Sequence, residues 1–71
     1  MIKYLVVFEK TSSGYSVYVP DLHGVVASGS TKEIAEQNIF EAITFHIEGL
    51  KEENLPIPLS VTESEVMVMA I

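Results

Sequence analysis

The stretch Val19–Val25, with the sequence VPDLHGV, decides the fold, because it marks where a run of alternating residues must end. Pro20 has no amide proton to donate to a neighbouring strand, and Asp21 can cap its own turn. Strand pairing is therefore expected to stop at Pro20. It is expected to resume in a short third strand at residues 25–27.

The residues before this stretch predict a β-hairpin. Residues 2–9 alternate between two faces, as in a strand, and residues 15–19 alternate in the same way. Between them, Thr11–Gly14 supplies turn chemistry, and Gly14 can adopt a positive φ. A three-stranded meander is predicted. The residues of its first strand that are expected to share one face are Ile2, Tyr4, Val6 and Phe8.

A long helix is predicted to follow the third strand. Ser30 or Thr31 can cap the free amides of its first turn, and Glu33 lies three residues after Ser30, as a capping box requires. The helix is expected to end at about Glu52 or Glu53.

One half of this helix is apolar and is expected to pack on the sheet. Phe40 and Ile47 lie outside that half and project in almost the same direction, where a solvated helix would carry polar residues. They are therefore interpreted as an interface stripe. The half expected to pack on the sheet consists of Ile34, Ala35, Asn38, Ile39, Ala42, Ile43, Phe45, His46, Gly49 and Leu50.

The residues after the helix predict an extended connector and a final strand. Asn54–Pro58 contains two prolines and cannot continue a helix. From Leu59 onward the chain is expected to be extended, and both faces of its last segment are apolar. One helix covers only one face of a sheet, so a second chain is expected to cover the other, giving at least a homodimer. The predicted oligomer interface consists of Leu5, Val7, Phe40, Ile47, Met67 and Met69.

Composition limits the functions that this chain can have. Its 71 residues allow one domain, and the absence of cysteine excludes a disulfide framework or a thiolate metal site. A soluble cytoplasmic protein without a leader peptide or membrane span is expected. The net charge of −6 disfavours binding of nucleic acid or anionic lipid and favours a basic protein partner.

Three residues are candidates for chemistry, namely Asp21, His23 and His46. Asp21 is interpreted as a turn-capping residue or a partner contact, because two-metal hydrolysis needs several converging carboxylates that the pattern does not supply. His23 is expected to be an exposed surface residue or a partner contact. His46 is expected to lie in the buried half of the helix and to hydrogen-bond a strand carbonyl or a tyrosine hydroxyl. No catalytic residue, metal site or cofactor is predicted.

The combined spacing of several motifs resembles that of the HicB family over nearly the whole chain. The resemblance implies a β-β-β-α-β domain with a partial RNase H-like fold. It also implies an antitoxin whose partner is HicA, a small RNase that cleaves mRNA. The motifs that carry the resemblance are Gly14–Val17, Pro20–Leu22, Gly24, Gly29–Thr31, Ala35, Asn38, Ala42, His46–Glu48 and Pro56–Pro58.

Two features depart from the family pattern. His23 stands where the family often has a second proline, and Val25 where it often has cysteine. Many HicB antitoxins also have a C-terminal DNA-binding module, which these 71 residues do not include, so operator binding is not expected of this domain alone.

We therefore expect an α+β domain with one sheet of three to five strands and a single helix on one face. The expected function is to bind and neutralise a basic HicA-type toxin without catalysis. The alternative is a self-assembling HicB-like domain that has no toxin partner.

Overall fold

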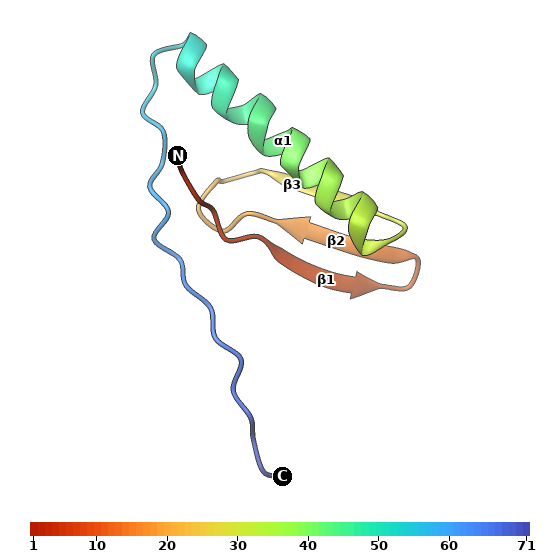
Figure 1. Cartoon of the computed structure of the whole chain (residues 1–71). Coiled ribbons are helices and arrows are strands. Elements are labelled where there is room, and N and C mark those ends of the chain that lie inside the picture. The colour runs from red at the N-terminus through yellow and green to blue at the C-terminus, as the bar shows by residue number, and fades with distance from the viewer.

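The computed structural model describes all 71 residues as a three-stranded sheet, one helix and an extended C-terminal segment (Figure 1). The strands are β1 (Val7–Thr11), β2 (Gly14–Tyr18) and β3 (Val26–Gly29), and the helix is α1 (Lys32–Glu52). The strands are antiparallel in the order β1-β2-β3, and α1 covers one face of the sheet. The expected α+β class is confirmed.

The register explains why the first strand is shorter at its start than expected. Phe8 pairs with Val17 and Val7 with Tyr18, the last residue of β2. Residues 2–6 therefore have no partner strand, so the predicted strand at residues 2–9 is observed only from Val7 and extends to Thr11. The third strand begins one residue later than predicted, at Val26, and runs to Gly29.

The loop from Val19 to Val25 is closed by its own backbone, which confirms that pairing stops at Pro20. The Val19 amide donates to the Val25 carbonyl at 3.2 Å, and the Val25 amide donates to the Leu22 carbonyl at 3.2 Å. Gly24 adopts a φ of 81°, which glycine tolerates without a steric penalty. Closing the loop in this way places Val19, Leu22 and Val25 in the core.

The helix begins after Thr31, whose Oγ1 accepts a hydrogen bond from the Ile34 amide at 3.1 Å. Thr31 is therefore the N-cap, and the predicted capping box with Glu33 does not form, because the third residue after this cap is Ile34. The predicted end of the helix is confirmed at Glu52.

The core is small and lies between α1 and the sheet. The helix packs mainly over β3 and β2, where the Asn38 amide group donates to the Ser28 carbonyl at 2.8 Å. Part of the predicted packing half is wrong, because Ile34 and Phe45 are exposed, Phe45 by 82%. The Ile34 side chain still approaches the sheet at Gly29, where its Cγ2 atom would lie 2.8 Å from an added Cβ. Phe45 lies on a side of α1 that the sheet does not cover. The buried residues are Val17, Val19, Leu22, Val25, Ala35 and Ile39.

The predicted final strand is not formed within this chain. Residues 55–71 are extended but have no strand partner, and they run past the N-terminus and away from the helix (Figure 1). A strand needs a neighbour to accept and donate its backbone hydrogen bonds. The last segment is therefore extended, as the sequence pattern predicted, but it does not pair with another strand of the same chain.

Gly29 provides a test of the contact between helix and sheet. A Cβ at Gly29 would lie 2.5 Å from the backbone nitrogen of Ala35, and a rotamer change cannot relieve a clash with backbone. Gly29→Ala is expected to lower the free energy of unfolding by about 1–3 kcal/mol, as measured by denaturant titration.

Gly49→Ala is the matched control for this prediction. Gly49 lies inside α1 with nothing within 4 Å of the added methyl group. The control is expected to raise the free energy of unfolding by about 0.5–1 kcal/mol, because alanine is the better helix former. Equal stabilities of the two variants would contradict the observed close approach.

Candidate protein-interaction surface

Asp21 fastens the C-terminal segment to the β2–β3 loop. Its Oδ2 accepts hydrogen bonds from the amides of Val61 at 2.9 Å and Thr62 at 3.0 Å, and its Oδ1 accepts one from the Thr62 hydroxyl at 2.7 Å. The interpretation of Asp21 as a cap for its own turn is therefore wrong. These partners lie 40 and 41 residues later in the chain.

A second anchor lies nearby, where the Tyr4 hydroxyl donates to the Pro58 carbonyl. Burial, and second the negative charge of Asp21, raise the pKa of Tyr4 above its ordinary value. Hydrogen bonds from Thr62, through its hydroxyl and then its amide, lower the pKa of Asp21. Together the two anchors hold residues 58–62 against the body of the domain.

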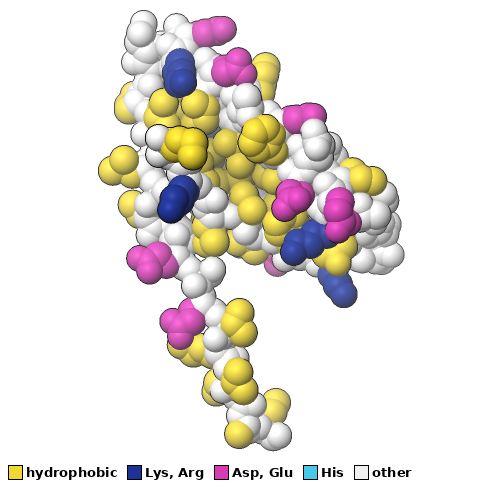
Figure 2. Space-filling view, in the orientation of Figure 1, with side chains coloured by type: hydrophobic (Ala, Val, Ile, Leu, Met, Phe, Trp, Pro, Cys, Tyr) yellow, Lys and Arg dark blue, Asp and Glu magenta, His cyan; other side chains and the backbone are white.

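An apolar groove with a volume of about 480 Å³ runs between α1 and the N-terminal segment. Hydrophobic side chains gather on this face of the molecule (Figure 2). The groove exists because α1 lies over β3 and β2 rather than over the chain that leads into β1. Its apolar lining consists of Ile2, Tyr4, Val6, Ile39, Phe40, Ile43 and Ile47, and its polar and charged lining of Glu36, Thr44, Glu48 and Lys51.

The sheet face opposite the helix is a second surface without cover. Val7, Tyr18 and Val26 are cross-strand neighbours, so their side chains share this face. Val26 is 66% exposed and Tyr18 is also exposed. The opposite end of the same face is polar, because Glu9, Ser16 and Ser28 are cross-strand neighbours there.

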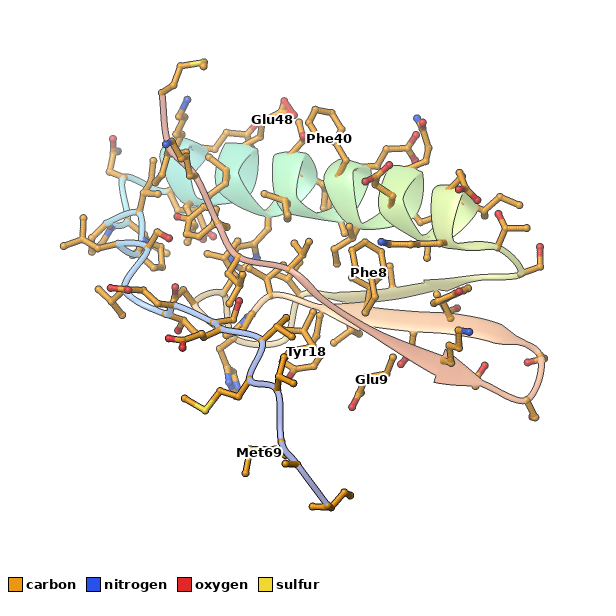
Figure 3. All side chains as sticks on the ribbon, turned by 60° about the horizontal axis from the view of Figure 1, so that its bottom comes forward. Phe8, Glu9, Tyr18, Phe40, Glu48 and Met69 are labelled. Carbon is orange, nitrogen blue, oxygen red and sulfur yellow. The ribbon has the colours of Figure 1, made fainter.

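The C-terminal segment beyond the anchors carries the third apolar surface. Residues 63–71 are all exposed, and no backbone group among them takes part in a hydrogen bond. Met67 is 72% exposed and Val68 is 96% exposed. Met69 points into open space away from the sheet and the helix (Figure 3).

The residues predicted for the oligomer interface therefore lie in several places. Phe40 and Ile47 line the groove, and Met67 and Met69 are on the C-terminal segment. Val7 is on the open sheet face, and Leu5 is half-buried in the unpaired segment that leads into β1. Ile47 also packs partly against the core, so it lies closer to the sheet than expected.

The two histidines have different environments. His23 is exposed in the loop after Asp21, as expected. His46 is half-buried on α1, but its side chain makes no hydrogen bond, so the predicted bond to a strand carbonyl or a tyrosine is wrong. No group of three or more histidine, aspartate or glutamate side chains could hold a metal ion. The single helix is too polar for a membrane crossing.

The sequence pattern did not reveal the anchoring residues Tyr4, Pro58 and Thr62. Tyr4 fitted the alternation of a strand, and Thr62 lay in a segment interpreted only as extended. Their partners are 54 and 41 residues away, so no local spacing could have indicated these contacts. The proline pair was correctly interpreted as a connector, without any indication of what it contacts.

A family model for the HicB_like antitoxin of bacterial toxin-antitoxin systems matches residues 4–70. The chain belongs to this family. The match includes both anchors and the whole apolar part of the C-terminal segment up to Ala70. The resemblance inferred from motif spacing is thereby confirmed.

Relatives of this HicB-like chain occur in a phage and in an archaeon. An uncharacterized 14.9 kDa protein of Haemophilus phage HP1 is 44% identical over 57 residues, which are 80% of this chain and 43% of the phage protein. The chain thus spans less than half the length of that relative. A UPF0150 protein of Thermoplasma acidophilum is 47% identical over 58 residues, covering 80% of this chain and 84% of the relative.

The solved HicA3 and HicB3 toxin-antitoxin complex contains a chain with a similar fold. The similarity has a TM-score of 0.70 and 33% sequence identity, and it covers 84% of this chain and 70% of that chain. The similarity therefore extends beyond the helix and the three strands into part of the C-terminal segment.

The anchor at Asp21 predicts a specific titration. In the anchored state the pKa of this carboxyl is lowered, so the contact contributes stability above the ordinary carboxyl pKa and is lost as the pH falls through the lowered value. Replacement of Thr62 by valine removes the hydroxyl donor, and we expect the pKa of Asp21 to rise towards its ordinary value. The midpoint is measured from the carboxyl ¹³C shift by NMR.

Thr44→Val is the control for this titration, because the Thr44 hydroxyl donates to the Phe40 carbonyl inside α1. It is expected to leave the pKa of Asp21 unchanged. An unchanged pKa in Thr62→Val as well would show that the carboxylate does not hold the C-terminal segment in solution.

Proposed function

We propose that this HicB-like protein is an antitoxin that binds and neutralises a small, basic, mRNA-cleaving toxin of HicA type. The observation that carries this proposal is the similarity of fold and sequence to a chain of the HicA3 and HicB3 toxin-antitoxin complex. Membership of the HicB-like antitoxin family supports the same function. Neutralisation occurs by covering the toxin, and it requires no catalysis by the antitoxin.

The charge of the protein fits such a partner. Ten acidic and four basic residues give a net charge of −6. A ribonuclease that binds an RNA backbone presents a basic surface, so the two proteins attract each other over several ångströms in solution. The same negative charge repels RNA and DNA, so this domain alone is not expected to bind nucleic acid. The proposed place of action is the cytoplasm, where mRNA is translated.

We propose that the β2–β3 loop, with Asp21 and His23, is part of the toxin contact. His23 is exposed next to Leu22, which is buried, so the loop presents the imidazole from a rigid base. The Asp21 carboxylate accepts three hydrogen bonds from the C-terminal segment, so it contributes its charge and holds the surface beside the loop. Exposed apolar residues near the loop supply buried area.

The direct experiment is to purify this protein with the small basic protein encoded by the neighbouring gene and to measure native mass by light scattering. A stable complex that stops RNA cleavage by the partner supports the proposal. A protein that ignores this partner and associates only with itself supports the alternative of a self-assembling domain without a toxin. That alternative is favoured by the exposed apolar residues of the C-terminal segment.

Replacement of His23 by alanine is expected to weaken toxin binding by about fivefold, equivalent to about 1 kcal/mol, if the loop lies in the interface. Thermal stability is expected to stay unchanged, because the imidazole is exposed. Ser12→Ala, in the hairpin turn at the far end of the sheet, is the control that leaves affinity unchanged. Isothermal titration calorimetry measures the affinity of each variant for the toxin. If His23→Ala binds the toxin as tightly as Ser12→Ala does, the toxin contacts another surface.

A further inference from the structure

The domain has an apolar segment without a cover and an apolar groove without an occupant. Residues 66–71 read VMVMAI and contain no charged side chain, so both of their strand faces can be buried without burying an ionised side chain. Exposed as they are here, they leave large apolar side chains in water. A segment of this kind is stable only when another surface covers both faces.

The N-terminal segment supplies an open strand edge. Residues 2–6 alternate as a strand does, with Tyr4 and Val6 packed towards the core, yet no strand pairs with them. β1, into which they lead, is an edge strand of the sheet. Its backbone groups on the side away from β2 are therefore free to pair with one more strand.

The groove lies beside this edge and could cover the side chains of such a strand. Phe40 and Ile47 line it on the helix, and Ile2 and Val6 line it on the N-terminal segment. Phe40 is 67% exposed, which is unusual for a phenylalanine and is explained if a strand lies beneath it. An added strand would thus form backbone hydrogen bonds along one edge and pack one of its faces against the helix.

The chain's own C-terminal segment is directed away from this groove. The Tyr4 and Asp21 anchors hold residues 58–62 across the end of the sheet, and the following residues continue on the side opposite the helix (Figure 1). To enter its own groove the segment would have to release Asp21 and reverse direction. A second copy of the chain can instead provide the strand while both anchors stay in place.

We infer that two copies of this chain exchange their C-terminal segments. Residues 63–71 of each copy add to the free edge of residues 2–6 and β1 in the other copy, and their apolar side chains fill its groove. Nine residues of strand span roughly 30 Å, enough to pair along nearly the whole of this edge. The exchange is reciprocal, so it closes as a two-fold dimer and leaves neither segment exposed.

The proposed dimer brings together predicted interface residues that lie far apart within one chain. Phe40 and Ile47 receive the segment, and Met67 and Met69 belong to it. The open sheet face, whose apolar end includes Val7, is the face opposite the helix. The segment runs away from the helix on this side of the sheet (Figure 1), so the second copy has apolar surface to contact there as well. The toxin plays no part in this argument, so the dimer can be tested without it.

The first experiment measures native mass by light scattering over a range of concentrations. The unmodified chain is expected to have twice the 7.8 kDa mass of one chain. Met67→Asp combined with Met69→Asp is expected to give monomers with an unchanged helical circular dichroism signal, because both residues are exposed outside the folded body. Ser64→Asp, in the same segment but outside the apolar run, is the control that remains dimeric. A monomeric parent protein overturns the inference.

The second experiment uses the absence of cysteine to identify what occupies the groove. A Thr44→Cys chain carries its thiol in the groove, and a Met67→Cys chain carries it on the segment. Oxidation of their mixture is expected to give a disulfide-linked pair of one chain of each kind. Ser12→Cys mixed with Met67→Cys is the control that yields little of this mixed product.

Two results of this experiment contradict the inference. Predominant linkage of Met67→Cys chains to each other would show that the segments pair together and leave the groove empty. A chain that carries both Thr44→Cys and Met67→Cys and forms its disulfide within itself would show that the segment folds back into its own groove. In the proposed dimer that double variant links two chains.

Discussion

The rest of the structure depends on one buried cluster, in which Ala35 and Ile39 of α1 pack with Val17 of β2 and with Val19, Leu22 and Val25 of the β2–β3 loop. Only six residues are buried, so no other part of the domain supplies a comparable core. A helix can approach the sheet this closely because Gly29 leaves room for the backbone of the first helical turn. Since α1 lies over β3 and β2, the N-terminal side of the sheet stays uncovered, and the apolar groove follows from this placement.

A chain that is 48% hydrophobic and buries only six residues must place the remaining apolar surface elsewhere. In this domain it gathers in the groove, on the open sheet face and along the C-terminal segment. Small domains bury a low fraction of their surface, and association is a common way to complete the core. The proposed strand exchange buries two of these surfaces at once, because the C-terminal segment of one copy fills the groove of the other.

The antitoxin function and the exchanged dimer use different parts of the molecule. The proposed toxin contact uses charge and the β2–β3 loop, whereas the exchange uses the groove and residues 63–71. Asp21 links the two regions, because its carboxylate lies in the loop and holds Thr62, the last residue before the exposed segment. A partner that disturbs this carboxylate would therefore also change the direction in which the segment leaves the domain.

The amino-acid sequence by itself determined the local structure and the family. The proline after Val19, the glycine at position 14 and the capping threonine at position 31 act within a few residues of themselves, so the hairpin, the loop and the helix ends could be predicted. Periodicity also indicated that both faces of the last segment are apolar.

Only the tertiary structure decided what the extended segments contact. The anchors of Tyr4 and Asp21 join residues 40 or more positions apart, and the shortened pairing of β1 depends on where β2 ends. The exposure of Phe45 depends on how the helix is placed on the sheet, which helical periodicity does not specify. Local propensities act over one or two turns of chain, whereas these contacts depend on the relative placement of whole elements in space.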